Sequence, residues 1–387
     1  MSRVILSRRD FARSVTTAIG TWVLAPRLAH PSAAVLPAGR SQTGFPPGAV
    51  RIDSNENPYG PSQKALEAMT RSQAVSARYP DAQEDRMGDA LAKLHGVKSE
   101  NVILGCGSGE VLRMADAAFL GPGKNVIAAE PTFEAVLAFA RVTRADSIKI
   151  PLTSDHRHDL PAMTRACSAA TGLVYVCNPN NPTGTIVSRQ DLSAFLERVP
   201  KTAVVLVDEA YHHFVEDDRY ASALDWPGRM PNLLVVRTFS KIYGLAGLRL
   251  GYGIGSKETI EAMRPHRTWS NANAAVLEAA MASLEDAQHV PETRRLMNGT
   301  RRWLCSEMEK EGRSVIPSQA NFVMIDLGVD VSSVIAGLRE RNIFVGRKFP
   351  SLSSWLRVSI GTPEEMKRFV SGLREVLPSR GKALAAV

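Results

Sequence analysis

The chain has 387 residues, 44% of them hydrophobic, and a formal net charge of +8. A chain of this length and composition can bury a large core, and we expect two domains. No basic run with interleaved aromatic residues indicates nucleic-acid binding. The cysteines (Cys106, Cys167, Cys177 and Cys305) contain no C-x-x-C pair, and a disulfide framework is not expected. The histidines lack the spacing of a metal site, so no bound metal is expected.

The first 34 residues match a twin-arginine export signal. Arg8 and Arg9 are followed by Phe11, by a modestly apolar stretch (15–25) and by small residues at 32–34. We therefore expect a signal peptide at 1–34 and a periplasmic protein that is exported already folded. The alternative is a cytoplasmic protein with a basic N-terminus. The segment is too short and too polar for a stable membrane helix.

Three apolar runs of strand length, residues 101–104, 172–177 and 203–207, each end in a polar loop. The first loop is rich in glycine and leads into an amphipathic helix. In open α/β sheets, ligands bind beyond the carboxyl ends of the strands. We therefore expect the polar residues of these loops to converge on one crevice. They are Ser108, Asn181, Asp208 and Tyr211.

A fourth apolar run, residues 233–236, leads to Ser240, Lys241 and a Gly-rich turn, with Arg249 beyond the turn. A lysine in a dry pocket loses its proton more readily, because burial disfavours the ammonium. A neutral amine is what a Schiff base to an aldehyde cofactor requires. Ser240 and Arg249 are of the types that hold a phosphate. A solvated lysine is the ordinary interpretation, and the polar residues at the other strand ends argue against it.

These stretches resemble those of fold-type-I aminotransferases, which use pyridoxal phosphate, and within that group the histidinol-phosphate aminotransferase family. The Gly-rich loop alone would be weak evidence, but the combination is highly specific. The similarity covers the chain from about residue 50 to its end. The matching segments, in the order of the family, are residues 53–61, 78–81, 105–110, 131–133, 181–184, 208–211, 240–241 with 249, and 357–362.

The resemblance implies a role for each residue around the ring of pyridoxal 5′-phosphate. Lys241 would carry the cofactor and move the substrate's α-proton. Asp208 would pair with the protonated ring nitrogen, which the chemistry of this cofactor favours. Tyr211 and Asn181 would hydrogen-bond the ring oxygen, and Phe133 would stack on the ring.

The resemblance also implies a cradle for the cofactor phosphate. Ser108 and Gly109 would offer backbone N–H groups at a helix N-terminus, with Ser240 and Arg249 beside them. Gly109 departs from the family, which commonly has an acidic residue there. Tyr59 resembles a tyrosine that reaches the cofactor phosphate of the partner subunit, so a homodimer is expected.

Two arginines are candidates for substrate binding. By resemblance Arg357 clamps the substrate α-carboxylate, since a guanidinium fork matches a carboxylate. Arg347 resembles the arginine with which histidinol-phosphate enzymes help to hold the substrate phosphate. That alignment needs a gap of one residue, and a surface arginine is the alternative for Arg347.

The predicted fold class is α/β, with a mostly parallel sheet flanked by helices and a smaller C-terminal α+β domain. We expect four regions: a signal peptide (1–34), an N-terminal arm or linker (35–60), a large cofactor-binding domain (61–285) and a small C-terminal domain (286–387). The Ala-rich segment 271–285 would begin the helical connection to the small domain.

The function that we expect is transamination between an amino donor and a 2-oxo acid, with 2-oxoglutarate as the expected acceptor. The donor would be of the histidinol-phosphate-like or the aromatic amino acid class. A decarboxylase or lyase of the same fold is the alternative, and a non-catalytic binding protein is a more remote one. The sequence does not name the donor, and a periplasmic enzyme would be oddly placed for histidine biosynthesis.

Overall fold

The computed structural model describes residues 44–225 and 231–377. From Gly48 onward the chain forms one compact unit. The predicted signal peptide, residues 1–34, lies outside the described residues. Within the two described ranges, no helix combines the length and the apolar character needed to cross a membrane.

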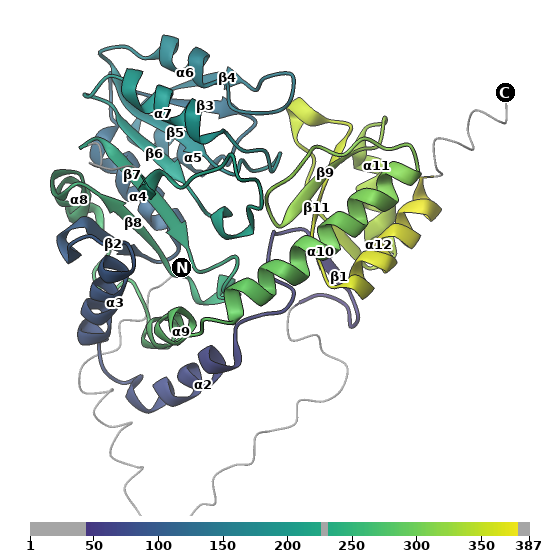
Figure 1. Ribbon diagram of the computed structural model, residues 1–387, viewed down its shortest axis with the longest axis horizontal. Helices are drawn as coiled ribbons and strands as arrows, with labels where there is room; N and C mark the ends of the chain where they lie inside the picture. Colours follow the sequence, from purple (N-terminus) through teal and green to yellow (C-terminus); the bar gives the residue numbers. More distant parts are fainter. Residues whose placement is uncertain (1–43, 226–230, 378–387) are drawn as a thin grey trace, which may run out of the picture. The chain divides into compact units, whose positions relative to one another are not determined.

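A seven-stranded sheet forms the centre of this unit (Figure 1). Its strands are β2 (Val102–Gly105), β3 (Asn125–Glu130), β4 (Asp146–Pro151), β5 (Thr171–Cys177), β6 (Val204–Asp208), β7 (Leu233–Thr238) and β8 (Gly251–Gly255). Their order is β2-β8-β7-β6-β5-β3-β4, and β8 runs antiparallel to both its neighbours. The four strands expected from the sequence are β2, β5, β6 and β7. Those four predictions are confirmed, with bounds that differ by one or two residues.

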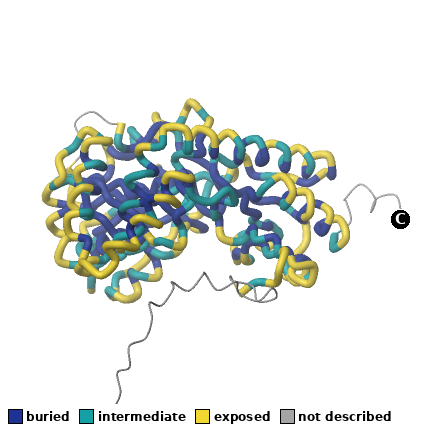
Figure 2. Tube along the Cα trace, turned by 90° about the horizontal axis from the view of Figure 1, so that it is seen from below, coloured by how far each residue is buried: buried dark blue, intermediate teal, exposed yellow. Residues whose placement is uncertain are grey.

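The central strands β5, β6 and β7 are buried at every position. This is typical of parallel strands that are covered on both faces. The helices α4 (Ser108–Phe119), α5 (Ala135–Thr143) and α8 (Lys257–Met263) pack on one face, and α6 (Leu160–Ala166) and α7 (Arg189–Arg198) pack on the other. Figure 2 shows the buried residues gathered in the interior, with exposed residues outside. The predicted α/β fold class is therefore confirmed.

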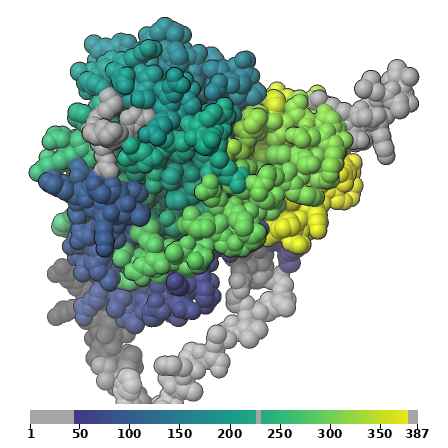
Figure 3. Space-filling model, viewed as in Figure 1, coloured from purple at the N-terminus to yellow at the C-terminus, as the bar shows by residue number. Residues whose placement is uncertain are grey.

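The C-terminal part of the unit is smaller and has mixed structure. It follows α9 (Ala274–Leu284) and the long helix α10 (His289–Lys310), and its helices are α11 (Val331–Glu340) and α12 (Pro363–Val376). Strands β9 (Phe322–Asp326) and β11 (Trp355–Ser359) pair antiparallel. Strand β10 (Ile343–Val345) pairs in parallel with β1 (Val50–Ile52), so the start of the compact unit is tied to its C-terminal part. Figure 3 shows these late segments packed against the earlier ones on one face. The domain boundaries stay a prediction.

The remaining elements connect these parts. The helices α2 (Gln63–Ser72) and α3 (Asp81–Leu94) precede the sheet, and α2 packs on α9. Short 3₁₀ segments are η1 (Gln73–Val75), η2 (Ser99–Asn101), η3 (His212–Phe214), η4 (Ala223–Asp225), η5 (Ala246–Leu248), η6 (Arg264–His266) and η7 (Pro350–Leu352).

The direction of the strands places the candidate site. Strand β8 is antiparallel to both β2 and β7, so β2 runs in the same direction as β5, β6 and β7. The carboxyl ends of these four strands therefore lie at one edge of the sheet. The loops that follow them carry the polar residues that the sequence analysis selected.

Candidate active site

A cavity of about 490 Å³ lies at this edge of the sheet. Its volume is in the usual range for a cofactor or small-molecule site. Most of the predicted site residues line it. They are Ser108, Gly109, Phe133, Asn181, Asp208, Tyr211, Ser240, Lys241, Arg249 and Arg357.

Asp208 provides a carboxylate on the buried side of the cavity. It is the last residue of β6, and 2% of its surface is exposed. One carboxylate oxygen accepts a hydrogen bond from the Ala210 N–H at 3.1 Å, and the other accepts one from the Tyr175 hydroxyl at 2.9 Å. Burial raises the pKa of Asp208 to about 6, and the bond from Tyr175 opposes that rise. A carboxylate held in this way can still accept a proton from a ligand.

Lys241 provides an amine to the same cavity. It follows β7, and its Nζ donates to the main-chain oxygen of Ser54 at 3.3 Å. Burial lowers the pKa of Lys241 to about 8, and the nearby Arg357 guanidinium lowers it further. A larger share of this amine is therefore neutral near pH 7 than for a solvated lysine, whose pKa is about 10.4. A neutral amine is the nucleophile that the sequence analysis expected.

The Tyr211 hydroxyl is held by two amides at the cavity wall. It accepts hydrogen bonds from Asn55 Nδ2 at 3.0 Å and from Asn181 Nδ2 at 3.4 Å. Its ring packs edge-on against Phe322, with 5.0 Å between the ring centroids. Because the oxygen accepts both of these bonds, the hydroxyl proton is available to a ligand oxygen.

A cradle for an anion forms where α4 begins. Gly107 has φ +76°, and a Cβ on it would lie 2.2 Å from Nη2 of Arg249. A Cβ on Gly251 would lie 2.2 Å from the backbone nitrogen of Ser108. The Arg249 side chain donates to Ser240 Oγ at 3.2 Å. Two glycines thus let a helix N-terminus, a hydroxyl and a guanidinium come together, as a phosphate site requires.

Glu110 holds the loop of this cradle. Its carboxylate accepts bonds from the Cys106 N–H and from Asn271 Nδ2, each at 2.7 Å. Its neighbour Gly109, where the family commonly has an acidic residue, lines the cavity without a side chain. The loop is therefore restrained by a carboxylate that does not line the cavity.

Arg357 is a half-buried cation on β11. Its terminal nitrogens donate to neutral oxygens, the Asn181 side chain at 2.9 Å and the Asp53 main chain at 2.7 Å. Within the described part of the chain its buried Nε has no hydrogen-bond partner. A guanidinium held on neutral acceptors keeps its full charge for a substrate carboxylate.

The structure does not bring two of the predicted site residues into this cavity. Arg347 lines an adjoining cavity of about 400 Å³ that shares Phe133, Asn181 and Arg357 with the first. Tyr59 lines neither cavity; burial raises the pKa of its hydroxyl, and the Thr300 side chain on α10 opposes that rise. The two cavities therefore adjoin each other, one lined by Lys241 and the other by Arg347.

Sequence reasoning missed several residues of the site. Asn55 is 2% exposed, has φ +55° and is held by the Ser359 hydroxyl and the Asn321 amide. It lies in the matching segment 53–61, from which only Tyr59 was selected, so that segment was its signal. Thr238, which accepts the Ser240 N–H at 3.0 Å, lay in the run around Lys241. No local pattern pointed to Tyr175.

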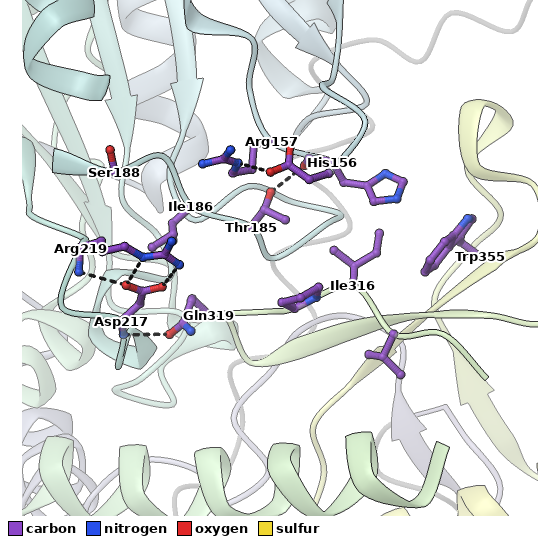
Figure 4. Close-up of a pocket in the computed structure, with 13 residues that line it drawn as sticks. His156, Arg157, Thr185, Ile186, Ser188, Asp217, Arg219, Ile316, Gln319 and Trp355 are labelled. Carbon is purple, nitrogen blue, oxygen red and sulfur yellow. Dashed lines mark hydrogen bonds and ion pairs between the residues drawn. The ribbon is translucent and has the colours of Figure 1, made fainter. Parts of the chain in front are cut away.

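A third cavity, of about 360 Å³, contains none of the predicted site residues. Figure 4 shows Trp355 and Ile316 facing His156 and Thr185 across it. Its lining arginines, Arg157 and Arg219, are each paired at 2.6 Å with an aspartate that also lines it. These charges are balanced within the wall, and we assign the cavity no function. In the described ranges no group of three or more His, Cys, Asp or Glu residues is placed to hold a metal.

The fold and the first cavity define an α/β enzyme in which a lysine amine, a buried carboxylate and an anion cradle face one another. Residues 48–373 match the family model of aminotransferase class I and II, and the chain belongs to this family.

Individual relatives agree with this family. A histidinol-phosphate aminotransferase from Moorella thermoacetica is 40% identical over 332 residues, which are 85% of each chain. One from Symbiobacterium thermophilum is 38% identical over 332 residues, 85% of this chain and 90% of that one. The crystal structure of the Sinorhizobium meliloti histidinol-phosphate aminotransferase in complex with pyridoxal-5′-phosphate has a TM-score of 0.80 and 27% identity. It covers 85% of this chain and 90% of that one.

Proposed function

We propose that Lys241 carries pyridoxal 5′-phosphate in this cavity and that the chain transfers an amino group from an amino donor to a 2-oxo acid such as 2-oxoglutarate. The chain is an aminotransferase by family, and its relatives favour transamination over the decarboxylase or lyase alternative. One observation carries the assignment of roles. The Lys241 amine, the Asp208 carboxylate and the Arg357 guanidinium line one cavity beside an anion cradle.

The residues present fit this cofactor. The backbone N–H groups of Ser108 and Gly109, with Ser240 and Arg249, match its phosphate. The carboxylate of Asp208 matches a protonated ring nitrogen, and the Tyr211 hydroxyl matches the ring oxygen. Phe133 is 39% exposed at the cavity, where its ring can stack on a flat ligand.

Each of these residues has a task in the reaction. When bound, the cofactor supplies an aldehyde and an electron-withdrawing ring. Asp208 keeps a proton on the ring nitrogen, and Arg357 orients the substrate through its carboxylate. Lys241 would then take the substrate's α-proton and return it at the carbon of the cofactor's aldehyde group. Such a positioned acid and base contributes roughly 10²–10⁴-fold to the rate.

The charged residues of the adjoining cavity favour some side chains of the amino donor over others. Phe349 lies between its two cations, with the guanidinium of Arg347 at 4.3 Å and that of Arg357 at 5.5 Å from the ring centroid. Glu134 binds Arg347 at 2.6 Å, and both side chains are about half exposed. A donor with an uncharged flat side chain can enter without disturbing this pair. A donor that brings an anion into this cavity, such as the distal carboxylate of glutamate or the phosphate of histidinol phosphate, must compete with Glu134 for Arg347.

This arrangement predicts that the two arginines differ in their effect on donors. Arg357→Ala should lower kcat/KM for phenylalanine, glutamate and 2-oxoglutarate alike, because it removes the group that binds the substrate carboxylate. Arg347→Ala should leave kcat/KM for phenylalanine unchanged. It should lower kcat/KM for glutamate and histidinol phosphate by about 1.5–3 kcal/mol of transition-state stabilisation, the usual value of a hydrogen bond to a charged group. Single-turnover half-reactions followed by the cofactor spectrum measure kcat/KM for each donor.

Glu134→Gln tests the same contact by a change that should raise kcat/KM instead of lowering it. It should raise kcat/KM for glutamate and histidinol phosphate on the order of two- to fivefold, as expected for release of an exposed ion pair. Glu375→Gln is the matched control, because it breaks a similar exposed pair, with Arg341 at 2.8 Å, outside the cavities. Equal losses for all donors in both arginine variants would refute the separate role of Arg347.

We also propose that the active enzyme is a homodimer in which Tyr59 reaches the cofactor phosphate of the other subunit. Tyr59 lies outside the cavity of its own chain, and the aromatic side chains of Trp269 and Tyr79 are 96% and 81% exposed. Such exposed aromatic surface is common at interfaces. Light scattering should give twice the mass of one chain, and Tyr59→Phe should weaken cofactor retention. A monomer with full activity would contradict the proposal.

We further propose that the protein is exported to the periplasm by the twin-arginine route. Arg8, Arg9 and Phe11 support this, as do the apolar stretch and the small residues before Val35. The compact unit begins at Gly48, so cleavage near residue 34 keeps every residue of the cavity.

Replacing both Arg8 and Arg9 with Lys should leave an active, uncleaved enzyme in the cytosol, because the route reads the arginine pair. N-terminal sequencing of the protein from its native host should find a chain that starts near Val35. An uncleaved chain in the wild-type cytosol would contradict export and leave the aminotransferase assignment intact.

A further inference from the structure

Tyr175 is a completely buried tyrosine in the middle of the central sheet. It lies on β5 with 0% of its surface exposed, and its hydroxyl donates to Asp208 Oδ2 at 2.9 Å. Tyrosine hydroxyls in a core normally find a partner, but this partner is the carboxylate at the base of the cavity. Tyr175 does not line the cavity itself.

The sheet register sets this contact. Tyr175 stands opposite Leu206, and Cys177 stands opposite Asp208. Side chains alternate between the faces of a sheet, so Tyr175, Cys177 and Asp208 lie on the same face. That face is covered by α4 and α5. The tyrosine therefore reaches Asp208 diagonally from the dry interior, on the side away from the cavity.

The surroundings make the contact sensitive to charge. Among the described residues, the charged and titratable groups near Asp208 are Glu209, Lys241, Cys177, Tyr175 and Tyr211. Glu209 is engaged elsewhere, since it binds Arg237 at 2.8 Å and accepts bonds from Ser222. Apart from the Ala210 N–H, the Tyr175 hydroxyl is the hydrogen-bond donor that the described residues give to Asp208. Water does not screen this bond, so its removal has a large effect.

We propose that Tyr175 is a positioning residue whose hydrogen bond keeps Asp208 ionised, so that the proton shared between Asp208 and the cofactor ring stays on the ring nitrogen. This inference rests on the proposed function. The inference adds to the proposed function a role for Tyr175, a residue that does not touch the cofactor.

The proton balance gives the sign of the effect. One proton lies between the ring nitrogen and Asp208, and it is held by whichever of the two is the stronger base. A hydrogen bond to the charged carboxylate stabilises that form and weakens it as a base. Loss of the Tyr175 hydroxyl therefore moves the proton from the ring to Asp208. The ring then withdraws electrons less strongly, and removal of the substrate α-proton slows.

The direct test is nitrogen-15 NMR of holoenzyme loaded with ring-labelled pyridoxal 5′-phosphate. In the wild type the ring nitrogen should give the signal of a protonated pyridine. In Tyr175→Phe the signal should move toward that of the unprotonated ring, and kcat should fall roughly tenfold, the effect of one hydrogen bond to a charged group. An unchanged signal in Tyr175→Phe would overturn the proposal.

Two further variants keep the test decisive. Tyr220→Phe removes another buried hydroxyl, one that has no hydrogen-bond partner in the described residues, and it should change neither readout. If Tyr175→Phe does not fold, 3-fluorotyrosine placed at position 175 keeps the ring and the hydroxyl and makes the hydroxyl a stronger donor. The signal should then stay at, or move further toward, the protonated form. A shift toward the unprotonated form would overturn the proposal.

Asp208→Asn separates this inference from the proposed function. If the wild-type ring is protonated and Asp208→Asn loses that signal while Tyr175→Phe keeps it, only the role of Tyr175 is wrong. If Asp208→Asn keeps the wild-type signal, the role proposed for Asp208 is wrong, and that for Tyr175 falls with it.

Discussion

The parallel register of β5, β6 and β7 is the constraint on which the site depends. Cys177 stands opposite Asp208, and Asp208 stands opposite Val236, so β5 and β6 end level and β7 extends to Thr238. Lys241 lies in the loop that follows β7, shortly after Thr238. A slip of β6 by one residue would turn Asp208 to the other face of the sheet and place Val207 at the cavity. Burial of all three strands on both faces opposes such a slip, so the same apolar residues that build the core also align the amine and the carboxylate.

Burial at this edge acts on the two groups in opposite directions. It disfavours the charged form of each, and so lowers the pKa of Lys241 and raises that of Asp208. Asp208 and the adjacent acid Glu209 have different hydrogen-bond partners, so they do not compete for the same groups. Glu209, next in sequence to Asp208, is buried in an ion pair with Arg237, and its carboxylate accepts hydrogen bonds from the Ser222 hydroxyl and the Ala223 N–H. Breaking such a buried pair costs about 3–5 kcal/mol, which fixes the chain direction after β6. Asp208 therefore remains available to a ligand in the cavity.

Much of the fold and most of the cofactor site could be predicted, because their signals are local. Apolar runs that end in polar loops locate β2, β5, β6 and β7, and the strand direction then brings Ser108, Asn181, Asp208 and Lys241 together. Contacts between distant segments could not be predicted in this way. The pairing of β1 with β10 joins residues nearly 300 apart, and Glu134 meets Arg347 across a separation of 213 residues. Tyr175 looks like any core aromatic in the sequence, and only the sheet register reveals its contact with Asp208.

The central claim is that Lys241 is the residue that bonds to the cofactor. Borohydride reduction of the holoenzyme, followed by proteolysis and mass spectrometry, measures this directly, because reduction makes the bond between amine and cofactor permanent. One modified peptide is expected, with the cofactor mass on Lys241. The other lysines serve as internal controls, and among them Lys149 and Lys257 are held in exposed ion pairs. Cofactor attached to another lysine, with Lys241 unmodified, would contradict the account.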